Sequence, residues 1–233
     1  MNKQSLSSKP SSNKSARTGA KKGAKTSSNE SGWRGSPDVW LKAAVEILLE
    51  SGVENVKIAT LSKRLNLSRT SFYWFFNDRE ALLSALVQTW KENNTGNIIK
   101  QAEAYADSLA EATLNVFDCW LDKELFDSRF EFAVRSWSLQ SNEILAEVHS
   151  ADQQRLDALT AMFKRYGFND IAADVHARTL YLVQIGYISM QTQEPLAVRM
   201  QRIPEYIKTF TGEYPEQKEL DRFFHRHGYP ESV

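Results

Sequence analysis

Apolar residues recur three or four positions apart along most of this 233-residue chain, which is the spacing of amphipathic helices. The first such stretch follows Ser36-Pro37, a helix-start pair in which the hydroxyl caps free amides and the proline fits the first turn. It ends at Gly52, a residue that tolerates the left-handed backbone of a helix C-terminus. The pattern predicts a helix over 37–51. Its inward face is formed by Trp40, Ala43, Ala44, Ile47 and Leu48.

A second, shorter pattern covers residues 58–65, where Leu61 and Leu65 share one helix face. Asn66 suits a tight turn, and Ser68 can cap a third helix that runs to about Phe76. Two short helices joined by a turn of about four residues are typical of a helix-turn-helix unit.

The aromatic stretch SFYWFF, residues 71–76, admits a second interpretation as a strand, because aromatic residues favour sheets. It lacks the alternation of a strand and lies between two helix caps, so we expect a helix. Asn77 and Glu80 stand three positions apart, as in a capping box, and predict the start of a fourth helix. The residues expected to pack inward from this region are Leu67, Phe72 and Phe76.

Beyond residue 83, glycines and prolines separate further helical patterns, so the chain is predicted to be all-α. The expected helices are 79–106 (with an optional break near 93–96), 108–122, 126–139, 142–166, 170–193, 197–211 and 217–226. The stretch 172–190 is apolar nearly all round. This predicts burial on several sides, either inside the domain or against another copy of the chain.

Charge is distributed unevenly although the formal net charge is zero. Residues 1–35 carry eight basic residues and one acidic residue, a net charge of +7, and 36–83 hold six of each sign. The first 35 residues are also poor in large apolar side chains, which predicts a disordered basic tail. The tail would either keep the protein soluble or add sequence-independent phosphate contacts.

No catalytic constellation is evident in the sequence. The histidines (His149, His176, His225 and His227) are scattered, no phosphate loop occurs, and no metal or cofactor site is expected. Glu131 and Arg135 stand four positions apart and predict a salt bridge within a helix. Cys119 is the single cysteine, no apolar run is long enough for a membrane span, and no secretion signal is visible. We therefore expect a cytoplasmic protein that is not an enzyme.

The outer face of the third helix indicates binding to DNA. Arg69 can donate two hydrogen bonds to guanine, and Thr70 offers a hydroxyl and a methyl group to thymine. Ser71 and Tyr73 are better placed to bond phosphates, which positions the helix without reading sequence. Arg79 can add its charge to the amides of the next helix at a phosphate. Trp74 shares the outer face, although packing against the first helix is a second option for it and for Tyr73.

Residues 37–88 resemble the N-terminal domain of the TetR family of transcriptional regulators. The likeness lies in Ala43-Ala44, Leu48 and Gly52, in Leu61-Ser62 through Leu65–Ser68, in Ser71–Tyr73 with Phe76, and in 78–83. It covers about a fifth of the chain. Lys57, Trp74 and Phe75 depart from the family pattern, and Lys57 could still reach a phosphate. With these positions, the candidate DNA-binding residues are Lys57, Ser68, Arg69, Thr70, Ser71, Tyr73, Trp74 and Arg79.

The resemblance implies a helix-turn-helix DNA-binding domain at 36–83 and a helical regulatory and dimerisation domain at 84–233. It further implies a homodimer formed through about 170–211, an inverted-repeat operator on double-stranded DNA, and a repressor released by a small-molecule effector. The candidate pocket residues are Phe117, Trp120, Phe130, Phe132, Trp137, Tyr181 and Gln184. The alternative is a DNA-binding architectural or adaptor protein whose C-terminal domain binds a protein partner. A helical enzyme or carrier with an incidental helix-turn-helix is a further alternative.

Overall fold

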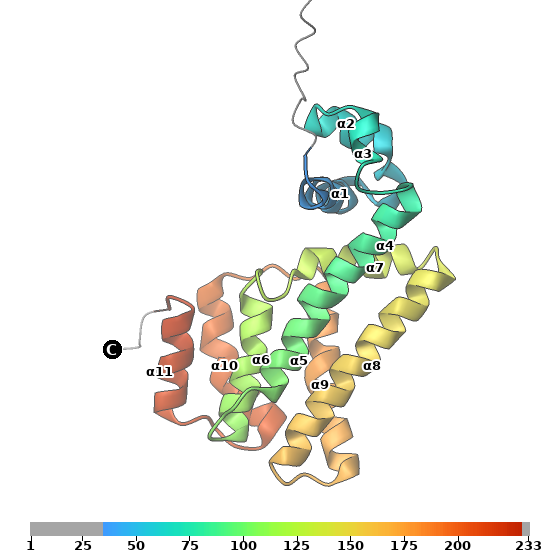
Figure 1. Cartoon of the computed structure of the whole chain (residues 1–233). Helices are drawn as coiled ribbons and strands as arrows, with labels where there is room; N and C mark the ends of the chain where they lie inside the picture. The colour runs from blue at the N-terminus through green and yellow to red at the C-terminus, as the bar shows by residue number, and fades with distance from the viewer. Residues whose placement is uncertain (1–34, 230–233) are drawn as a thin grey trace, which may run out of the picture. The chain divides into compact units, whose positions relative to one another are not determined.

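The computed structural model describes residues 35–229, and these residues are helical without any strand (Figure 1). The predicted tail at 1–35 therefore lies almost wholly outside the described residues. The elements are α1 (Pro37–Ser51), η1 (Val53–Asn55), α2 (Ile58–Leu65), α3 (Arg69–Phe72), α4 (Arg79–Trp90), η2 (Lys91–Thr95), α5 (Gly96–Glu103), α6 (Leu109–Leu121), α7 (Ser128–Ser138), α8 (Asn142–Arg165), α9 (Asp170–Ser189), α10 (Leu196–Thr211) and α11 (Gln217–Arg226). The all-α prediction is confirmed.

The helix-start and helix-stop signals of the first three helices act as predicted. The Ser36 hydroxyl accepts a hydrogen bond from the Val39 amide at 3.3 Å, and Pro37 occupies the first turn of α1. Gly52 ends α1 with φ 80°, a backbone conformation that residues other than glycine rarely adopt. Asn66 takes the left-handed conformation with φ 52° between α2 and α3, which places the two helices of the helix-turn-helix at an angle.

Two details of the helix-turn-helix region differ from the prediction. The third helix ends at Phe72, and 73–75 form turns in which the Phe75 amide bonds the Phe72 carbonyl at 2.9 Å. The cap of α4 is Asp78, whose carboxylate accepts from the Ala81 amide at 2.7 Å, so the expected Asn77 cap was wrong. Both side chains can cap a helix, and the backbone path decides which of two neighbours faces the free amides.

The predicted break near 93–96 is a π-helical turn, η2, that joins α4 to α5 without interrupting the helical path. A π turn inserts an extra residue and rotates the following side chains about the helix axis. Here it turns Asn94 and Thr95 into the interior, where they are 0% and 3% exposed. The helical path that leaves the helix-turn-helix therefore carries two polar side chains into the interior.

The described residues form two hydrophobic cores. The first holds the inner faces of α1 to α4, and it also includes residues of α7 and α8, among them Phe130, Val134 and Val148. Helix α1 contacts α7 directly, and α4 contacts α7 as well. The predicted domain boundary after residue 83 lies inside α4, and the first core extends beyond it.

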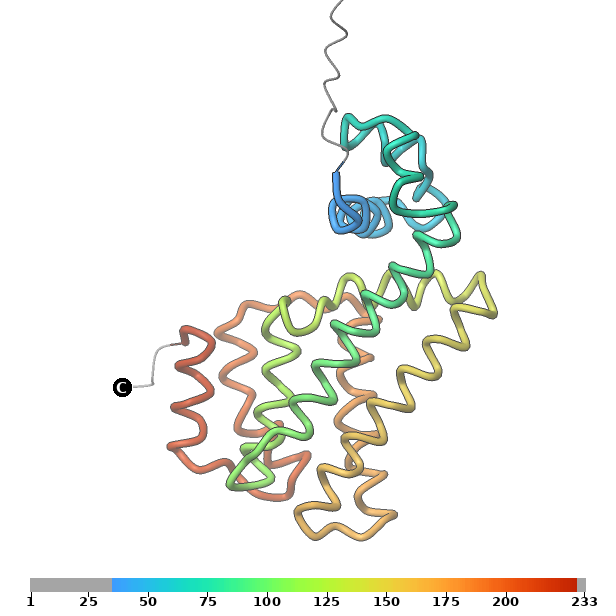
Figure 2. Tube along the Cα trace, viewed as in Figure 1, coloured from blue at the N-terminus to red at the C-terminus, as the bar shows by residue number. Residues whose placement is uncertain are grey.

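The second core is formed by α5, α6 and α8 to α11. Helix α6 contacts α5 on one side and α10 and α11 on the other, as Figures 1 and 2 show. Helix α9 ends at Ser189 instead of the predicted 193, because Gln191 adopts a left-handed backbone with φ 50°. Among residues 35–229, no helix is long and apolar enough to cross a membrane.

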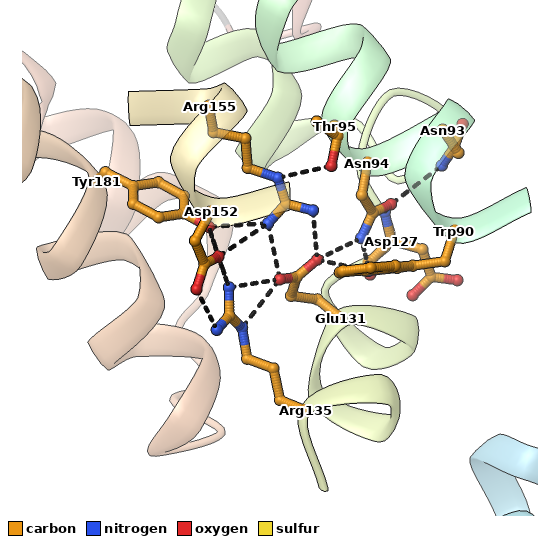
Figure 3. A network of polar contacts seen from close by, with 10 residues as sticks. All are labelled: Trp90, Asn93, Asn94, Thr95, Asp127, Glu131, Arg135, Asp152, Arg155 and Tyr181. Carbon is orange, nitrogen blue, oxygen red and sulfur yellow. Dashed lines mark hydrogen bonds and ion pairs between the residues drawn. The ribbon is translucent and has the colours of Figure 1, made fainter. Parts of the chain in front are cut away.

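A buried network of charged residues is shown in Figure 3, and it links Trp90 of the first core to Tyr181 of the second. Glu131 of α7 is 0% exposed, and its carboxylate accepts from Arg155 Nη1 at 2.8 Å, Arg135 Nε at 2.9 Å and Trp90 Nε1 at 2.7 Å. Burial alone raises the pKa of Glu131, but the Arg155 and Arg135 charges and hydrogen bonds outweigh it and hold that pKa at about 2. The predicted salt bridge between Glu131 and Arg135 is confirmed as one part of a larger group.

The network connects five helical segments, namely α4, η2, α7, α8 and α9. Arg155 of α8 donates from Nε to Thr95 Oγ1 at 2.9 Å and from Nη1 to the Tyr181 hydroxyl of α9 at 2.8 Å. That hydroxyl donates to Asp152 at 2.6 Å, and Asn94 donates to Glu131 at 3.0 Å (Figure 3). Two guanidinium groups and two carboxylates balance in charge, which makes their burial tolerable. Helix α9 is thereby linked to the π turn that continues α4.

Candidate nucleic-acid interface and ligand recess

The third helix is held from behind by aromatic packing. Phe72 is fully buried, and its ring meets Trp40 of α1 edge-on at 5.4 Å and Phe76 at 5.5 Å. Ser68 caps the helix by accepting from the Ser71 amide at 3.1 Å. Because the inner face and the first turn are both fixed, the outer face is presented in a defined orientation.

The outer face carries the side chains that the sequence singled out. Tyr73 and Trp74 are 57% and 62% exposed, which is unusual for large aromatic residues in a protein with two well-packed cores. Arg69 and Thr70 are exposed in the first turn of α3, and Ser68 and Lys57 are exposed nearby in sequence. The structure thus exposes an arginine and hydroxyls at the start of α3 and two aromatic rings in the turn that follows it.

Two predicted DNA contacts are placed differently from the others. Ser71 is 7% exposed, and its hydroxyl lies 2.9 Å from the Ser68 hydroxyl, behind the outer face. Arg79 donates from Nε to the Val56 carbonyl at 2.7 Å and from Nη2 to the Val53 carbonyl at 2.8 Å. Arg79 therefore fastens the start of α4 to the segment between α1 and α2. Sequence reasoning missed this role, since the partners are 23 and 26 positions away.

The structure does not bring the candidate pocket residues together. Phe130 belongs to the first core, Tyr181 belongs to the charge network, and Trp137 lines a separate hollow beside α4 and α8. Phe117, Trp120 and Gln184 do line one cavity, which lies between α6, α9 and α10. Phe132 and Gln184 line a second, wider hollow that adjoins it.

The two adjoining hollows form one recess, because Gln184, Tyr187, Glu194 and Arg199 line both. The inner part has a volume of only about 30 Å³, and the outer part measures about 510 Å³. We call the two parts together the α9–α10 recess. The further residues of its inner wall are Leu180, Val183, Arg202, Ile203, Tyr206 and Phe210. Those of its outer wall are Leu49, Ser128, Arg129, Ala133, Ile188, Gln191, Thr192 and Gln193.

The α9–α10 recess contains polar residues that sequence reasoning missed, and its outer part reaches α1. Arg199, Arg202, Glu194 and Tyr187 follow no motif that marks a ligand site, and only the packing of α10 on α6 and α9 assembles them. Leu49 of α1 is part of the outer wall. A molecule in the outer part would touch α1 as well as α7 and α9.

The described part of the chain contains no cluster of three or more histidine, cysteine or acidic residues that could hold a metal ion. Cys119 is fully buried, and burial raises the pKa of its thiol to about 12. A thiol with so high a pKa is a poor nucleophile at neutral pH.

Comparison with known proteins gives the same assignment as the helix-turn-helix geometry. Residues 41–86 match the family described as "Bacterial regulatory proteins, tetR family". The chain is 30% identical over 67 residues to the tetracycline repressor protein class A from transposon 1721 of Escherichia coli. That match covers 29% of this chain and spans 31% of the repressor's length.

Solved structures share the fold over most of the chain. A transcriptional regulator of the TerR/AcrR family from Aquifex aeolicus VF5 has a TM-score of 0.60 at 14% identity, covering 75% of this chain and 99% of that one. The fatty acid degradation regulator FadR from Bacillus halodurans has a TM-score of 0.55 at 18% identity, covering 79% and 98%. Residues 41–86 therefore match the DNA-binding domain of the TetR family of transcriptional regulators, and the chain as a whole shares the fold of solved regulators.

Proposed function

We propose that the protein is a sequence-specific repressor that binds an inverted-repeat operator as a homodimer and is released by a small-molecule effector. The observation that carries the proposal is the exposed surface of α3 and of the turn after it, where Arg69, Thr70, Tyr73 and Trp74 face solvent over the buried Phe72 ring. Residues 36–83 would form the DNA-binding domain and 84–233 the regulatory domain. A regulator that reads chromosomal DNA would act in the cytoplasm.

Each exposed side chain has a distinct proposed role on DNA. Arg69 would read a guanine through two hydrogen bonds, and Thr70 would contact a thymine. Phosphates would be contacted by Tyr73, by Lys57 and by the Ser68 hydroxyl, and these contacts would orient the helix. Trp74 would pack against the sugar-phosphate edge or a base. Ser71 and Arg79 would support this surface from behind, through the contacts with Ser68 and with the two backbone carbonyls.

The outer face of α9 supports the homodimer. Ile171, Val175, Leu182 and Met190 are 79%, 54%, 56% and 80% exposed and lie along one side of the helix at intervals of four, seven and eight residues. An apolar stripe of this length on a monomer surface is a self-association site far more often than a solvated face. Together with α10 it would form the dimer contact, and a two-fold dimer reads two half-sites one or more helical turns apart.

Release by an effector would act through the helices that border the α9–α10 recess. Leu49 lies in α1 and Ala133 lies in α7, and these two helices contact each other. In the proposed dimer, the distance between the two α3 helices can vary. A ligand that binds the recess more tightly at one such distance would shift the population of dimers toward it. If that distance mismatches the operator, DNA affinity falls by the same coupling free energy.

The deciding experiment is selection of bound oligonucleotides from a random pool, followed by affinity measurements on the selected site. We expect a palindromic consensus. Arg69→Ala should relax the choice at one base position in each half-site and cost about 1–3 kcal/mol. Tyr73→Ala should weaken all sequences alike, and Lys57→Ala should also lower the salt dependence of binding.

The same selection distinguishes the proposed function from its alternatives. A consensus without symmetry would contradict the dimeric operator, and a pool without enrichment would contradict sequence-specific binding. The adaptor alternative requires a protein partner for the C-terminal domain, and the regulators to which the chain is similar do not favour it. Glu54→Ala is a suitable control, since Glu54 is exposed on η1 and has no proposed DNA contact.

A further inference from the structure

Arg199 of α10 is a charged side chain inside the α9–α10 recess that lacks a charged partner. Its Nη1 donates to the Trp120 carbonyl at 3.2 Å, and within residues 35–229 no carboxylate lies within ion-pair distance of it. Burial lowers the pKa of Arg199, and the nearby Tyr187 and Glu194 offset this effect only in part. A guanidinium has five N–H donors, so most of its hydrogen-bonding capacity is unused here.

Two further polar groups of the recess lack partners among the described residues. Gln184 of α9 is 9% exposed, lines both parts of the recess, and its amide makes no hydrogen bond to another described residue. Trp120 Nε1 is buried without an acceptor, and Trp120 lines the inner part. Buried donors are normally satisfied, and one left without an acceptor, as Trp120 Nε1 is, destabilises the empty recess. The recess is therefore built to receive an acceptor from outside the chain.

The charge of the recess specifies the kind of acceptor. Its walls hold three guanidinium groups, of Arg129, Arg199 and Arg202, and one carboxylate, of Glu194, for a net charge of +2. Glu194 is paired with Arg202, so it does not neutralise Arg199. A cation is excluded by this balance. The rest of the outer lining is mixed: Leu49, Phe132, Ala133 and Ile188 give it apolar surface beside the polar 191–193 segment. An anion that also carries an apolar group would use this surface better than a small hydrophilic anion.

We propose that the α9–α10 recess binds an amphipathic organic carboxylate, an anion with one carboxylate and an apolar aliphatic or aromatic group. The carboxylate lies where the two parts meet and accepts from Arg199 and the Gln184 amide. The apolar group fills the outer part, whose volume of about 510 Å³ is in the range of small-molecule sites. The proposal rests on the proposed effector-controlled function, for which it names the chemical class of the effector.

The test uses matched acids and neutral amides on the full-length protein. Octanoate, dodecanoate, naphthalene-2-carboxylate and indole-3-acetate are each compared with the primary amide of the same skeleton, by calorimetry and by Trp fluorescence. At least one acid should bind at least about tenfold more tightly than its amide, because a charge-assisted pair in a desolvated site is worth more than 1.4 kcal/mol. Failure of all four acids to bind, or equal binding of each acid and its amide, overturns the proposal.

Variants test whether Arg199 is the anchor. Arg199→Gln should remove the preference for the acid, and Arg199→Lys should restore part of it, as the charge is kept and the fork geometry is lost. The fold should survive, since Arg199 makes one hydrogen bond to the described residues and its charge is disfavoured by burial. Arg178→Gln on the exposed face of α9, where Arg178 pairs with Asp174, is the control and should bind as the parent does. An unchanged preference in Arg199→Gln and Arg199→Lys would refute the assignment.

The ligand test and the function test fail separately. Affinity for the selected operator is measured with and without the acid that binds best. If the acid binds in an Arg199-dependent way and DNA affinity is unchanged, release by an effector is wrong and the carboxylate site stands. If the acid does not bind and the protein still binds its operator, the carboxylate site is wrong and the regulator stands.

Discussion

Replacing Glu131 with glutamine should lower the free energy of unfolding by about 3 kcal/mol, because the substitution leaves two buried guanidinium groups with too little negative charge. Glutamine has the shape of glutamate, so packing is preserved and the change is electrostatic. Of the charges that surround Glu131, only Asp152 would remain to balance Arg135 and Arg155. The network would then carry one uncompensated positive charge in a site that excludes water.

The magnitude follows from two independent lines of reasoning. The pKa of Glu131 is held at about 2 against an ordinary value of 4.5, which corresponds to about 3 kcal/mol of preferential stabilisation of the ionised form. Removing one partner of a buried ion pair costs about 3–5 kcal/mol in other proteins. The hydrogen bonds agree in direction. Whichever way the amide is turned, its NH₂ faces at least two donors, either those of Arg155 and Arg135 or those of Arg155, Trp90 and Asn94.

Urea unfolding followed by circular dichroism measures the loss. Glu147→Gln is the matched control. Glu147 pairs with Lys91 at the surface, and its loss should cost no more than about 1 kcal/mol. The double variant Glu131→Met with Arg155→Met removes one charge of each sign and should be less destabilised than the two single variants summed. A Glu131→Gln variant within 1 kcal/mol of the parent would refute the reasoning.

The remaining predictions concern pH, the helix-turn-helix anchor and the dimer. The folded-state pKa of Glu131 is lower than its ordinary value, so its contribution is complete above about pH 4.5 and is lost as pH falls to about 2; acid titration of Glu131→Gln should show this loss reduced by about 3 kcal/mol. Arg79→Met should cost about 2–3 kcal/mol in urea unfolding, since two charge-assisted bonds to backbone carbonyls are lost, and a loss under 0.5 kcal/mol would show that the anchor is unimportant. Leu182→Glu should shift the molecular mass in solution from dimer to monomer by placing a charge in the α9 stripe, whereas an unchanged mass would place the dimer contact elsewhere.

Local signals in the sequence were sufficient to predict most helix ends and the orientation of α3. Ser36, Gly52 and Ser68 act within a few residues of their own position, so the structure confirms what their chemistry indicates. The different burial of Phe72 and Tyr73 was predictable in the same way. The helical period alone assigns the Phe72 ring to the core and the Tyr73 ring to solvent. The family resemblance was recognisable for the same reason, since its motifs are short and continuous.

Partners far apart in the sequence could not be found in this way. The sequence indicated the pair of Glu131 and Arg135, four positions apart, but gave no sign that Arg155 lies against the same carboxylate from another helix. Arg199 looked like any solvated helix residue until the packing of α10 on α6 and α9 removed water from around it. Arg79 was expected at a phosphate, and its nearest acceptors come from the segment that precedes α2.

The amino-acid sequence by itself determined the helices, their caps, the helix-turn-helix and the side chains on its outer face, because each depends on interactions within one or two turns. Only the tertiary structure decided which polar side chains are deprived of water and which partners they meet. Desolvation is a property of the packed assembly and of no single segment. Burial alone would raise the pKa of Glu131, and the arginines that the same packing brings against it hold that pKa low. Packing also leaves Arg199 and Gln184 unpaired in the recess, and it is therefore the source of this protein's proposed response to a ligand.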